Sequence, residues 1–412
     1  MMMMVLRSSK KLRACWSSSD WASLPEDLLV LILHRLIQLS DYFRFGAVCK
    51  PWHAGADHQK VHRRRDKQEV PMLLIPPPAK TAEEADYHCR RLYSVTQRKV
   101  LPNLELRVPY PRRCCGSSHG WLATWNQADA GITLLNPFSG KSFRFPKVSL
   151  RHSGLSHDHS YEFYVRKVVL SHDPSLMPNN DFVVAAIFGV SSALAYIKPG
   201  DNHWTYMPKA YDQVMSCLMD VIYHLGKFYV VDAYSGIHSV DISSFSEPRV
   251  EELAPRTTTK ADKAYLVKSC EGDLLLVQRF LAIRGSPRRL TTSCFKIFKV
   301  LGSSAGIDGQ IDGQIVERVE IYSLGDNTLF LGDNYSLSVY SPDFPGCRKN
   351  CIYFTDDYSN CNSNLPYYPY GSRDTGIYCL QDRSFVSHYR VRTKQKHVPI
   401  PPPVWIVPPL LL

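Results

Sequence analysis

A serine flanked by glycines is the first candidate for chemistry in this chain. Gly116, Ser118 and Gly120 match the pattern G-x-S-x-G, in which a serine nucleophile occupies a sharp turn between a buried strand and a helix. No helical periodicity follows Ser118, and Trp121 begins a β-like run instead. The glycines are more typical of a tight entry into a sheet, so we predict no catalytic residue and no enzyme activity.

The cysteines and histidines of the chain lack the spacing typical of a metal-binding site. Cys347, Cys351 and Cys361 lie near one another, but no CxxC pair or suitably spaced histidine completes four ligands. The histidines within residues 152–159 lie among Ser, Gly and Asp, as in a solvated loop. We therefore expect no metal and no cofactor. Twelve cysteines without a secretory signal indicate free thiols in a reducing compartment.

The chain is basic, with a net charge of +11 and a run of one histidine and three arginines at residues 62–65. Such runs can bind nucleic acid or direct nuclear import, but no DNA- or RNA-binding motif accompanies this one. Positive charge also suits an acidic protein partner. A nucleic-acid-binding adaptor therefore stays the weaker alternative.

The N-terminal residues 1–19 lack the continuous apolar stretch of a secretory signal and read as a disordered basic tail; a mitochondrial presequence is the alternative. The longest uncharged stretch, residues 182–197, is too short and too polar for a membrane span. We expect no membrane partner and a nuclear or cytoplasmic location.

Residues 20–58 read as a small helical module. Ser23 and Glu26 have capping-box spacing, and Pro25 suits a first helical turn. Leucines and isoleucine follow at helical spacing at positions 28, 29, 32, 33 and 36. A second helix is expected from Ser40 and Asp41 to Lys50, ending before Pro51. So small a unit cannot bury all these side chains, so some must face the rest of the chain or another protein.

Beyond a charged linker at residues 59–70, short β-rich runs alternate with turn residues at a period of about 40 to 50 residues, as in propeller blades. Six units can be counted within residues 71–395, and seven is the alternative. Trp121, Leu135, Phe228 and Phe354 should be buried between blades. In the Pro-rich segment 396–412, Val404 begins a run that could close the ring. The alternative fold, a single twisted β-sandwich, would be unusually long for the body of this chain. The predicted fold class is multidomain α plus all-β.

The helical module has Leu-Pro at its first turn, apolar residues at Ile32 and Leu36, and Val-Cys-x-x-Trp at its end. In these residues it resembles the F-box, which docks substrate receptors onto the Skp-type adaptor of cullin-RING ubiquitin ligases. The resemblance implies adaptor contacts at Leu24, Pro25, Leu28, Ile32, Leu36, Val48 and Trp52. These side chains should be partly exposed in the free chain.

Five further motifs stand out in the body of the chain, at residues 116–122, 135–137, 264–267, 323–326 with 329–332, and 350–357. In these motifs it resembles the kelch-like, KIB-type β-propeller of plant F-box proteins, first catalogued as a domain of unknown function. The resemblance implies a substrate-receptor subunit of an SCF-type ubiquitin ligase, whose propeller loops hold a client protein. A propeller that sequesters its client without degradation is the alternative.

Client contacts are expected where arginine, histidine and tyrosine gather in loops, as in interaction hot spots. The candidate segments are residues 152–161, 284–289 and 356–373. The candidate residues are His157, Tyr161, Arg284, Arg288, Tyr358, Tyr367 and Arg373.

Overall fold

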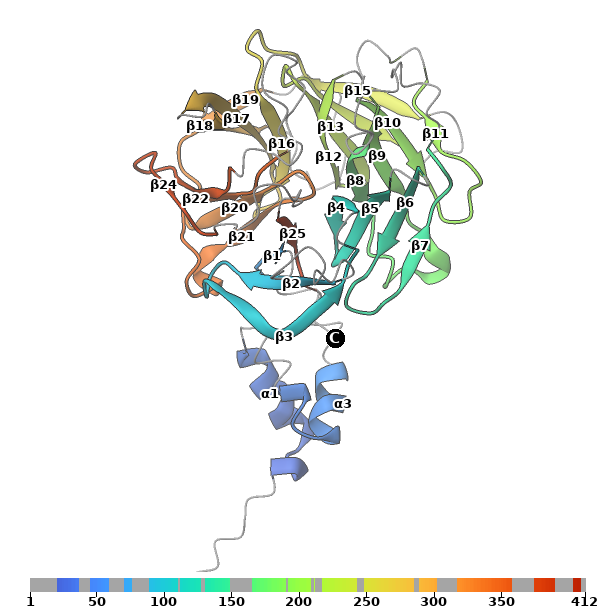
Figure 1. Cartoon of the computed structure of the whole chain (residues 1–412), viewed down its shortest axis with the longest axis vertical. Helices are drawn as coiled ribbons and strands as arrows, with labels where there is room; N and C mark the ends of the chain where they lie inside the picture. Colours follow the sequence, from blue (N-terminus) through green and yellow to red (C-terminus); the bar gives the residue numbers. More distant parts are fainter. Residues whose placement is uncertain are drawn as a thin grey trace, which may run out of the picture. The chain divides into compact units, whose positions relative to one another are not determined.

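The computed structural model of the 412-residue chain divides into two compact units, one over Met1–Lys67 and one over Gln68–Leu410 (Figure 1). It describes residues 21–36, 45–58, 70–75, 89–109, 112–126, 130–148, 165–189, 192–208, 211, 217–242, 248–284, 289–301, 317–357, 374–389 and 403–408. Each unit is considered separately below.

The first unit is helical. A 3-10 turn, η1 (Trp21–Ser23), precedes α1 (Glu26–Arg35), and α3 (Lys50–His58) packs against both. The buried side chains that join them are Leu29, Leu33, Phe45 and Ala56. Gly55 of α3 faces Leu29 of α1, and a Cβ there would be in ordinary contact, 3.6 Å from the Leu29 side chain. No described helix is long and apolar enough to cross a membrane.

The helices differ from the sequence prediction in two respects. The N-cap of α1 is Pro25, not Ser23, because the extended backbone of Pro25 directs its carbonyl to the amides of Leu28 and Leu29. Of the second helix expected up to Lys50, the described residues 45–46 are helical and residues 47–49 are not, so it ends before Pro51 as predicted. The sequence analysis did not expect the next helix, which begins at Lys50 and carries Pro51 in its first turn, where a proline's missing N–H costs nothing. Ser40 and Asp41 lie outside the described residues.

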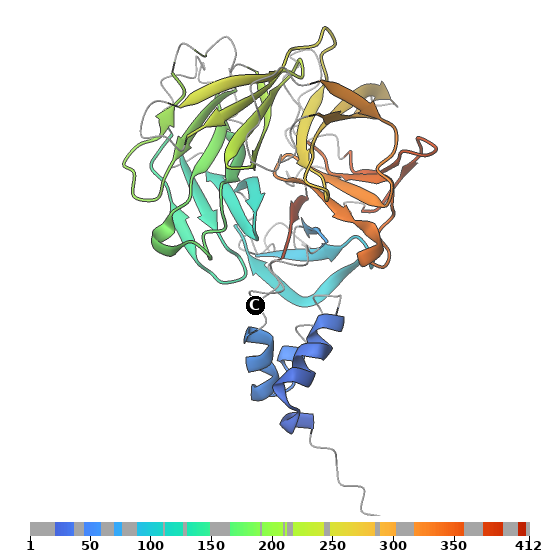
Figure 2. The same ribbon diagram turned by 180° about the vertical axis from the view of Figure 1, so that it is seen from behind.

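The second unit is a six-bladed β-propeller (Figures 1 and 2). Its described strands form six sheets, one for each blade. Blade 1 contains β25 (Val404–Ile406), β1 (Met72–Ile75), β2 (Cys89–Ser94) and β3 (Lys99–Arg107). Blade 2 contains β4 (Arg113–Ser118), β5 (Trp121–Asn126), β6 (Gly131–Leu135) and β7 (Ser142–Arg144). Blade 3 contains β8 (Val165–Leu170), β9 (Val184–Phe188), β10 (Ala193–Ile197) and β11 (Thr205–Tyr206).

The later blades follow the same plan until the last. Blade 4 contains β12 (Leu218–His224), β13 (Lys227–Asp232), β14 (Ile237–Asp241) and β15 (Arg249–Ala254). Blade 5 contains β16 (Lys263–Lys268), β17 (Leu274–Arg284), β18 (Arg289–Val300) and β19 (Arg318–Ile321). Blade 6 contains β20 (Asn327–Leu331), β21 (Ser336–Tyr340), β22 (Cys351–Phe354), β23 (Gly376–Cys379) and β24 (Phe385–Val386). The described helical turns here are short 3-10 segments, η4 (Pro178–Asn180) and η6 (Ser341–Asp343).

Six inner strands line the centre of the ring, and neighbours contact one another in the order β25, β4, β8, β12, β16 and β21. Two of them, β4 and β21, are absent from the strands expected from sequence. Blade 6 also departs from the expected four strands: β20 turns back into the inner strand β21, and β22 then pairs parallel to β20. The strand β25 pairs antiparallel with β1, the position expected for a closing strand.

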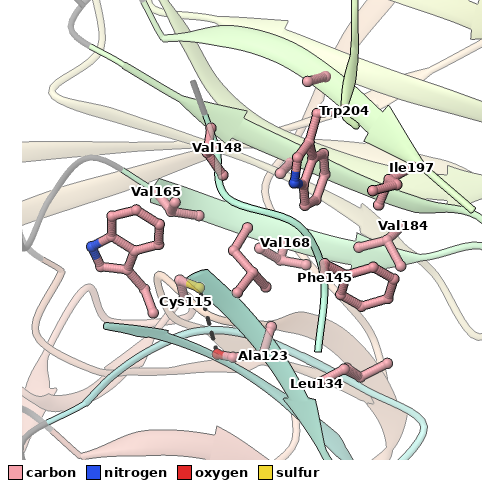
Figure 3. Packing of buried hydrophobic residues seen from close by; sticks show 14 of the residues in the cluster. Cys115, Ala123, Leu134, Phe145, Val148, Val165, Val168, Val184, Ile197 and Trp204 are labelled. Carbon is pink, nitrogen blue, oxygen red and sulfur yellow. Dashed lines mark hydrogen bonds between the residues drawn. The ribbon is translucent and has the colours of Figure 1, made fainter. Parts of the chain in front are cut away.

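Apolar side chains fill every interface between neighbouring blades, in six separate clusters. Figure 3 shows the cluster between blades 2 and 3, where Cys115 and Ala123 face Val165 and Val168. Successive residues of a strand serve opposite interfaces: Leu274 contacts blade 4, whereas Leu275 contacts blade 6. Each sheet is therefore covered on both faces only when its neighbours are present.

Three of the four side chains expected between blades are fully buried there. Trp121, Phe228 and Phe354 belong to the clusters of blades 2–3, 3–4 and 5–6. Leu135 was expected to be buried but is only half-buried. It is the last residue of β6 and packs against the cluster between blades 1 and 2.

Candidate functional site

The helical unit exposes a large share of its apolar side chains. On α1, Leu29 and Leu33 are 2% and 3% exposed, whereas Leu28 and Leu31 on the same helix are 45% and 59% exposed. Val48, between the helices, is 56% exposed. Exposed leucines and valine at this density make this surface a candidate binding site.

The predicted adaptor-contact residues all lie partly or fully at this unit's surface. Leu24, Ile32, Leu36 and Trp52 are half-buried, while Pro25, Leu28 and Val48 are exposed. Trp52 also has a structural role, because its indole N–H donates to the Trp21 carbonyl at 2.8 Å and its ring lies 4.4 Å from that of Phe45. Leu31 matches Leu28 in exposure but belongs to no predicted contact.

Of the predicted client-contact residues, the structure describes Arg284 alone. Arg284 is exposed at the last position of β17. The other six lie outside the described residues: His157, Tyr161, Arg288, Tyr358, Tyr367 and Arg373.

Arg284 belongs to a two-stranded ribbon that extends beyond blade 5. The strands β17 and β18 pair from Leu274 to Arg284, whereas β16 pairs with β17 only as far as Arg279. A register shift follows Phe280, where the ribbon begins. Ile283 near its end is 51% exposed. This ribbon, residues 280–284 and 289–294, was not anticipated from sequence, although the unusual length of its apolar run was the available signal.

Carboxylates from outside the ribbon bind its two edges. Asp262 accepts from the Leu281 amide at 2.8 Å, and Asp374 accepts from the Thr292 amide at 2.6 Å. The base of the ribbon is therefore fixed on both sides. Beyond these two bonds, Ile283 and Leu290 pair with each other across the ribbon.

Arg279 is buried at the base of the ribbon and joins it to blade 6. Its guanidinium donates to Asp357 at 3.1 Å and to Asp374 at 2.9 Å, and it lies 4.8 Å from the centre of the Phe354 ring. Asp357 and Asp374 are the described residues that flank 358–373. The structure thus brings the two ends of one predicted client segment to the base of another.

A second group of buried charged residues forms a network on and beside the inner strands of the ring. Lys167 pairs with Asp220 at 2.9 Å, while Asp333 accepts from Lys263 at 2.5 Å and from Arg113 at 3.3 Å. These pairs join blades 3 to 4, 5 to 6 and 2 to 6. The sequence analysis missed all of them, although charged residues inside otherwise apolar strands were the signal in β8 and β12.

Burial and neighbouring charges shift the titration of this network. Burial raises the pKa of Asp357 to about 6, against the opposing effect of Lys263 and Lys167. Burial alone lowers the pKa of Lys263, but the carboxylates of Asp333 and Asp357 raise it overall. These pairs hold blades together at the ring's centre, and removing one partner would leave an uncompensated buried charge.

Ser118 has no nucleophile-elbow geometry. It is the last residue of β4, and β5 begins three residues later at Trp121, which pairs directly with it. His119 and Gly120 both have positive φ, as a two-residue hairpin turn requires. A strand therefore stands where the elbow needs a helix.

Comparison with known proteins agrees with this two-part organisation. Residues 92–379 match the KIB1-4 β-propeller family, and residues 21–68 match the F-box-like family. Similar Arabidopsis thaliana proteins include the putative F-box protein At3g25750, 26% identical with 82% of this chain and 88% of the relative covered. F-box protein At4g35733 is 25% identical, with 90% and 97% covered, and F-box protein SKIP23 is 26% identical, with 83% and 85% covered. The chain belongs to the KIB1-4 β-propeller family and carries an F-box-like segment before its propeller.

Proposed function

We propose that this protein is a non-catalytic substrate-receptor subunit of an SCF-type ubiquitin ligase. The observation that carries the proposal is the exposed apolar face of a helical unit that matches the F-box-like family. That face would bind a Skp-type adaptor and, through it, a cullin-RING ligase. The propeller would bind a client protein.

Such a receptor makes no bond itself. Holding the client's lysines near a ligase-bound ubiquitin conjugate raises their effective concentration and so accelerates transfer. Such positioning requires that the client-binding surface be rigid. The closed ring and its buried ion pairs would supply rigidity, while the client-binding residues would lie on the ribbon and on connections between strands.

The ribbon of blade 5 and the 358–373 segment are the proposed client platform. Arg279 ties the base of the ribbon to both flanks of that segment, so the two elements start from one fixed point. Exposed Ile283 and Arg284 give the ribbon an apolar and a cationic side chain. The partner that fits this end combines apolar and acidic residues.

Substitutions that remove the adaptor contact but leave the client contact test the proposal. Leu28→Asp together with Val48→Asp should abolish adaptor pull-down and client ubiquitination, yet leave client binding within a few-fold of wild type. Leu31→Asp is the control, because Leu31 is at least as exposed as Leu28 and Val48 but lies outside the predicted contact set. Equal loss in the control would show that any charge on this unit disrupts it.

Changes on the ribbon should have the opposite effect. Ile283→Asp with Arg284→Glu should weaken client capture while adaptor pull-down stays at the wild-type level. Proximity labelling by the full chain, compared with the isolated propeller, supplies the client for this assay. Client turnover that persists in the adaptor-binding variant would favour the sequestering alternative, and DNA or RNA binding with a steep salt dependence would favour the nucleic-acid alternative.

A further inference from the structure

Two cysteines in blade 6 lie side by side on neighbouring strands. Cys351 is the first residue of β22 and Cys379 is the last residue of β23, and the two are direct partners in the antiparallel register. Their Sγ atoms are 3.3 Å apart. Both thiols are free, and this pair is separate from the charged network and from the proposed adaptor surface.

The backbone at this point has the spacing that a cross-strand disulfide needs. The Leu380 amide donates to the Asn350 carbonyl at 3.1 Å, so the flanking residues form the hydrogen bond and the two cysteines occupy a non-hydrogen-bonded pair. Side chains at such pairs are the closer kind, with Cα atoms about 4.5 Å apart. A disulfide accepts Cα separations of about 4.4 to 6.8 Å. A small side-chain rotation therefore brings the sulfurs to bonding distance without moving the strands.

The two thiols differ in access. Cys351 is buried, whereas Cys379 is half-buried and open to a reagent from solvent. Burial, together with the neighbouring Cys379, raises the pKa of Cys351 to about 12. Cys379 is therefore the thiol that reacts first, and Cys351 is the slower one that completes the bond.

We propose that Cys351 and Cys379 form a reversible intramolecular disulfide by exchange with a small disulfide of the oxidised-glutathione class. The Cys379 thiolate attacks one sulfur of that disulfide and releases one small thiolate. Cys351 then loses its proton and attacks the Cys379 sulfur, which releases the second. The protein's two thiols are oxidised, the small disulfide is reduced to two thiols, and both protons end on the released molecules.

The bond would fasten the open end of the hairpin formed by β22 and β23. That hairpin carries residues 358–373 at its other end, between Asp357 and Asp374. Oxidation should therefore stabilise blade 6 against local opening, because the cross-link restricts the unfolded hairpin. The inference stands independently of the proposed ubiquitin-ligase role.

The test uses the full chain, equilibrated with oxidised and reduced glutathione at fixed ratios and then blocked with N-ethylmaleimide. Non-reducing peptide mass spectrometry of the wild type should find a disulfide between Cys351 and Cys379. Cys351→Ala should instead accumulate one glutathione on Cys379, because the second thiol is missing. Cys379→Ala should leave Cys351 largely unmodified.

Cys347→Ala is the matched control, since Cys347 is a nearby free thiol outside the pair, and it should form the bond as the wild type does. Oxidised wild type and oxidised Cys347→Ala should both melt at a higher temperature than their reduced forms. A wild type that stops at the Cys379 mixed disulfide, or that links Cys351 to Cys347, overturns the proposal. Because mapping of the wild type decides the point, the result stands even if a variant folds poorly.

Discussion

The helical unit and the propeller place their apolar side chains differently. In the propeller, each strand alternates between two interfaces, and the six clusters bury nearly every large apolar side chain in the middle of a strand. In the helical unit, α1 buries Leu29 and Leu33 but exposes Leu28 and Leu31. The difference agrees with the proposal that the helical unit binds another protein.

Geometry explains the contrast. A ring of blades covers both faces of every sheet, and the pairing of β25 with β1 leaves no gap in blade 1. Two short helices can cover only the stripe where they meet. Substitutions in the propeller should therefore act mainly on stability, and those on the exposed helical face should act mainly on binding.

The largest effect is expected at the closing strand. Trp405→Ala should lower the free energy of unfolding of the propeller by about 3 to 5 kcal/mol, because it empties a fully buried site. It also removes the indole's bond to the Leu331 carbonyl at 2.8 Å and its edge-on contact with Phe330. Denaturant titration of the full chain measures the change. A loss below about 1 kcal/mol would mean that the ring does not depend on this strand.

The next effect is on the pH dependence of the free energy of unfolding, to which two buried titratable residues contribute with opposite sign. Burial raises the pKa of Asp357 from 3.8 to about 6, so between these values the folded chain holds a proton that the unfolded chain releases. The free energy of unfolding then falls as the pH rises. Burial lowers the pKa of His388 from 6.5 to about 4, so the unfolded chain holds the extra proton and the free energy of unfolding rises with pH.

Each shift exceeds two pH units and is worth about 3 kcal/mol, so the two slopes should nearly cancel in the wild type between pH 4 and 6. In Asp357→Asn only His388 of this pair still titrates, so the free energy of unfolding should rise with pH. In His388→Phe, which keeps an aromatic ring, only Asp357 of this pair still titrates, so the free energy of unfolding should fall as the pH rises. Urea titrations at several pH values give these slopes. Parallel curves for both variants and the wild type would contradict the assignment.

A smaller effect is expected where two inner strands meet. Gly116→Ala places a Cβ 2.2 Å from the Val168 carbonyl oxygen, so β4 and β8 must move apart. We expect a loss of about 1 to 3 kcal/mol in the free energy of unfolding, as for overpacked cores. Gly140→Ala is the control for backbone strain alone, since φ is +73° and nothing lies within 4 Å. Gly116 itself has no positive φ, so a loss no larger than that of Gly140→Ala would mean that β4 and β8 relieve the crowding at little cost.

The smallest effect on stability is expected on the exposed helical face. Leu28→Asn should change the protection of α1 from hydrogen exchange by no more than about 0.5 kcal/mol, because the side chain is already largely in water. Leu29→Asn on the same helix should destabilise it strongly, because Leu29 is buried. Equal losses of protection would remove the distinction between a folding face and a binding face.

The strand-rich runs were sufficient to predict the six blades and the closing strand, because each run alternates or stays apolar between turn residues. The predicted runs did not include β4 or β21. The β4 segment ends in glycine and serines, which lack a strong preference for a strand, so contacts with neighbouring blades decide its conformation. The β21 segment, Ser336–Tyr340, does alternate between serine and apolar residues, so its signal was present but was not recognised. The outer strand β15 (Arg249–Ala254) was also not predicted.

The sequence by itself determined the helical spacing of the first unit, the period-two runs of the blades and the excess of leucines over what two helices can bury. These are local properties, set by backbone geometry and by which side chains avoid water. Only the tertiary structure decided that Asp333 joins Arg113 to Lys263, that Arg279 holds Asp357 to Asp374, and that Cys351 faces Cys379. Those contacts join positions up to 220 residues apart. They depend on closing the ring in one register, which no local stretch of sequence specifies.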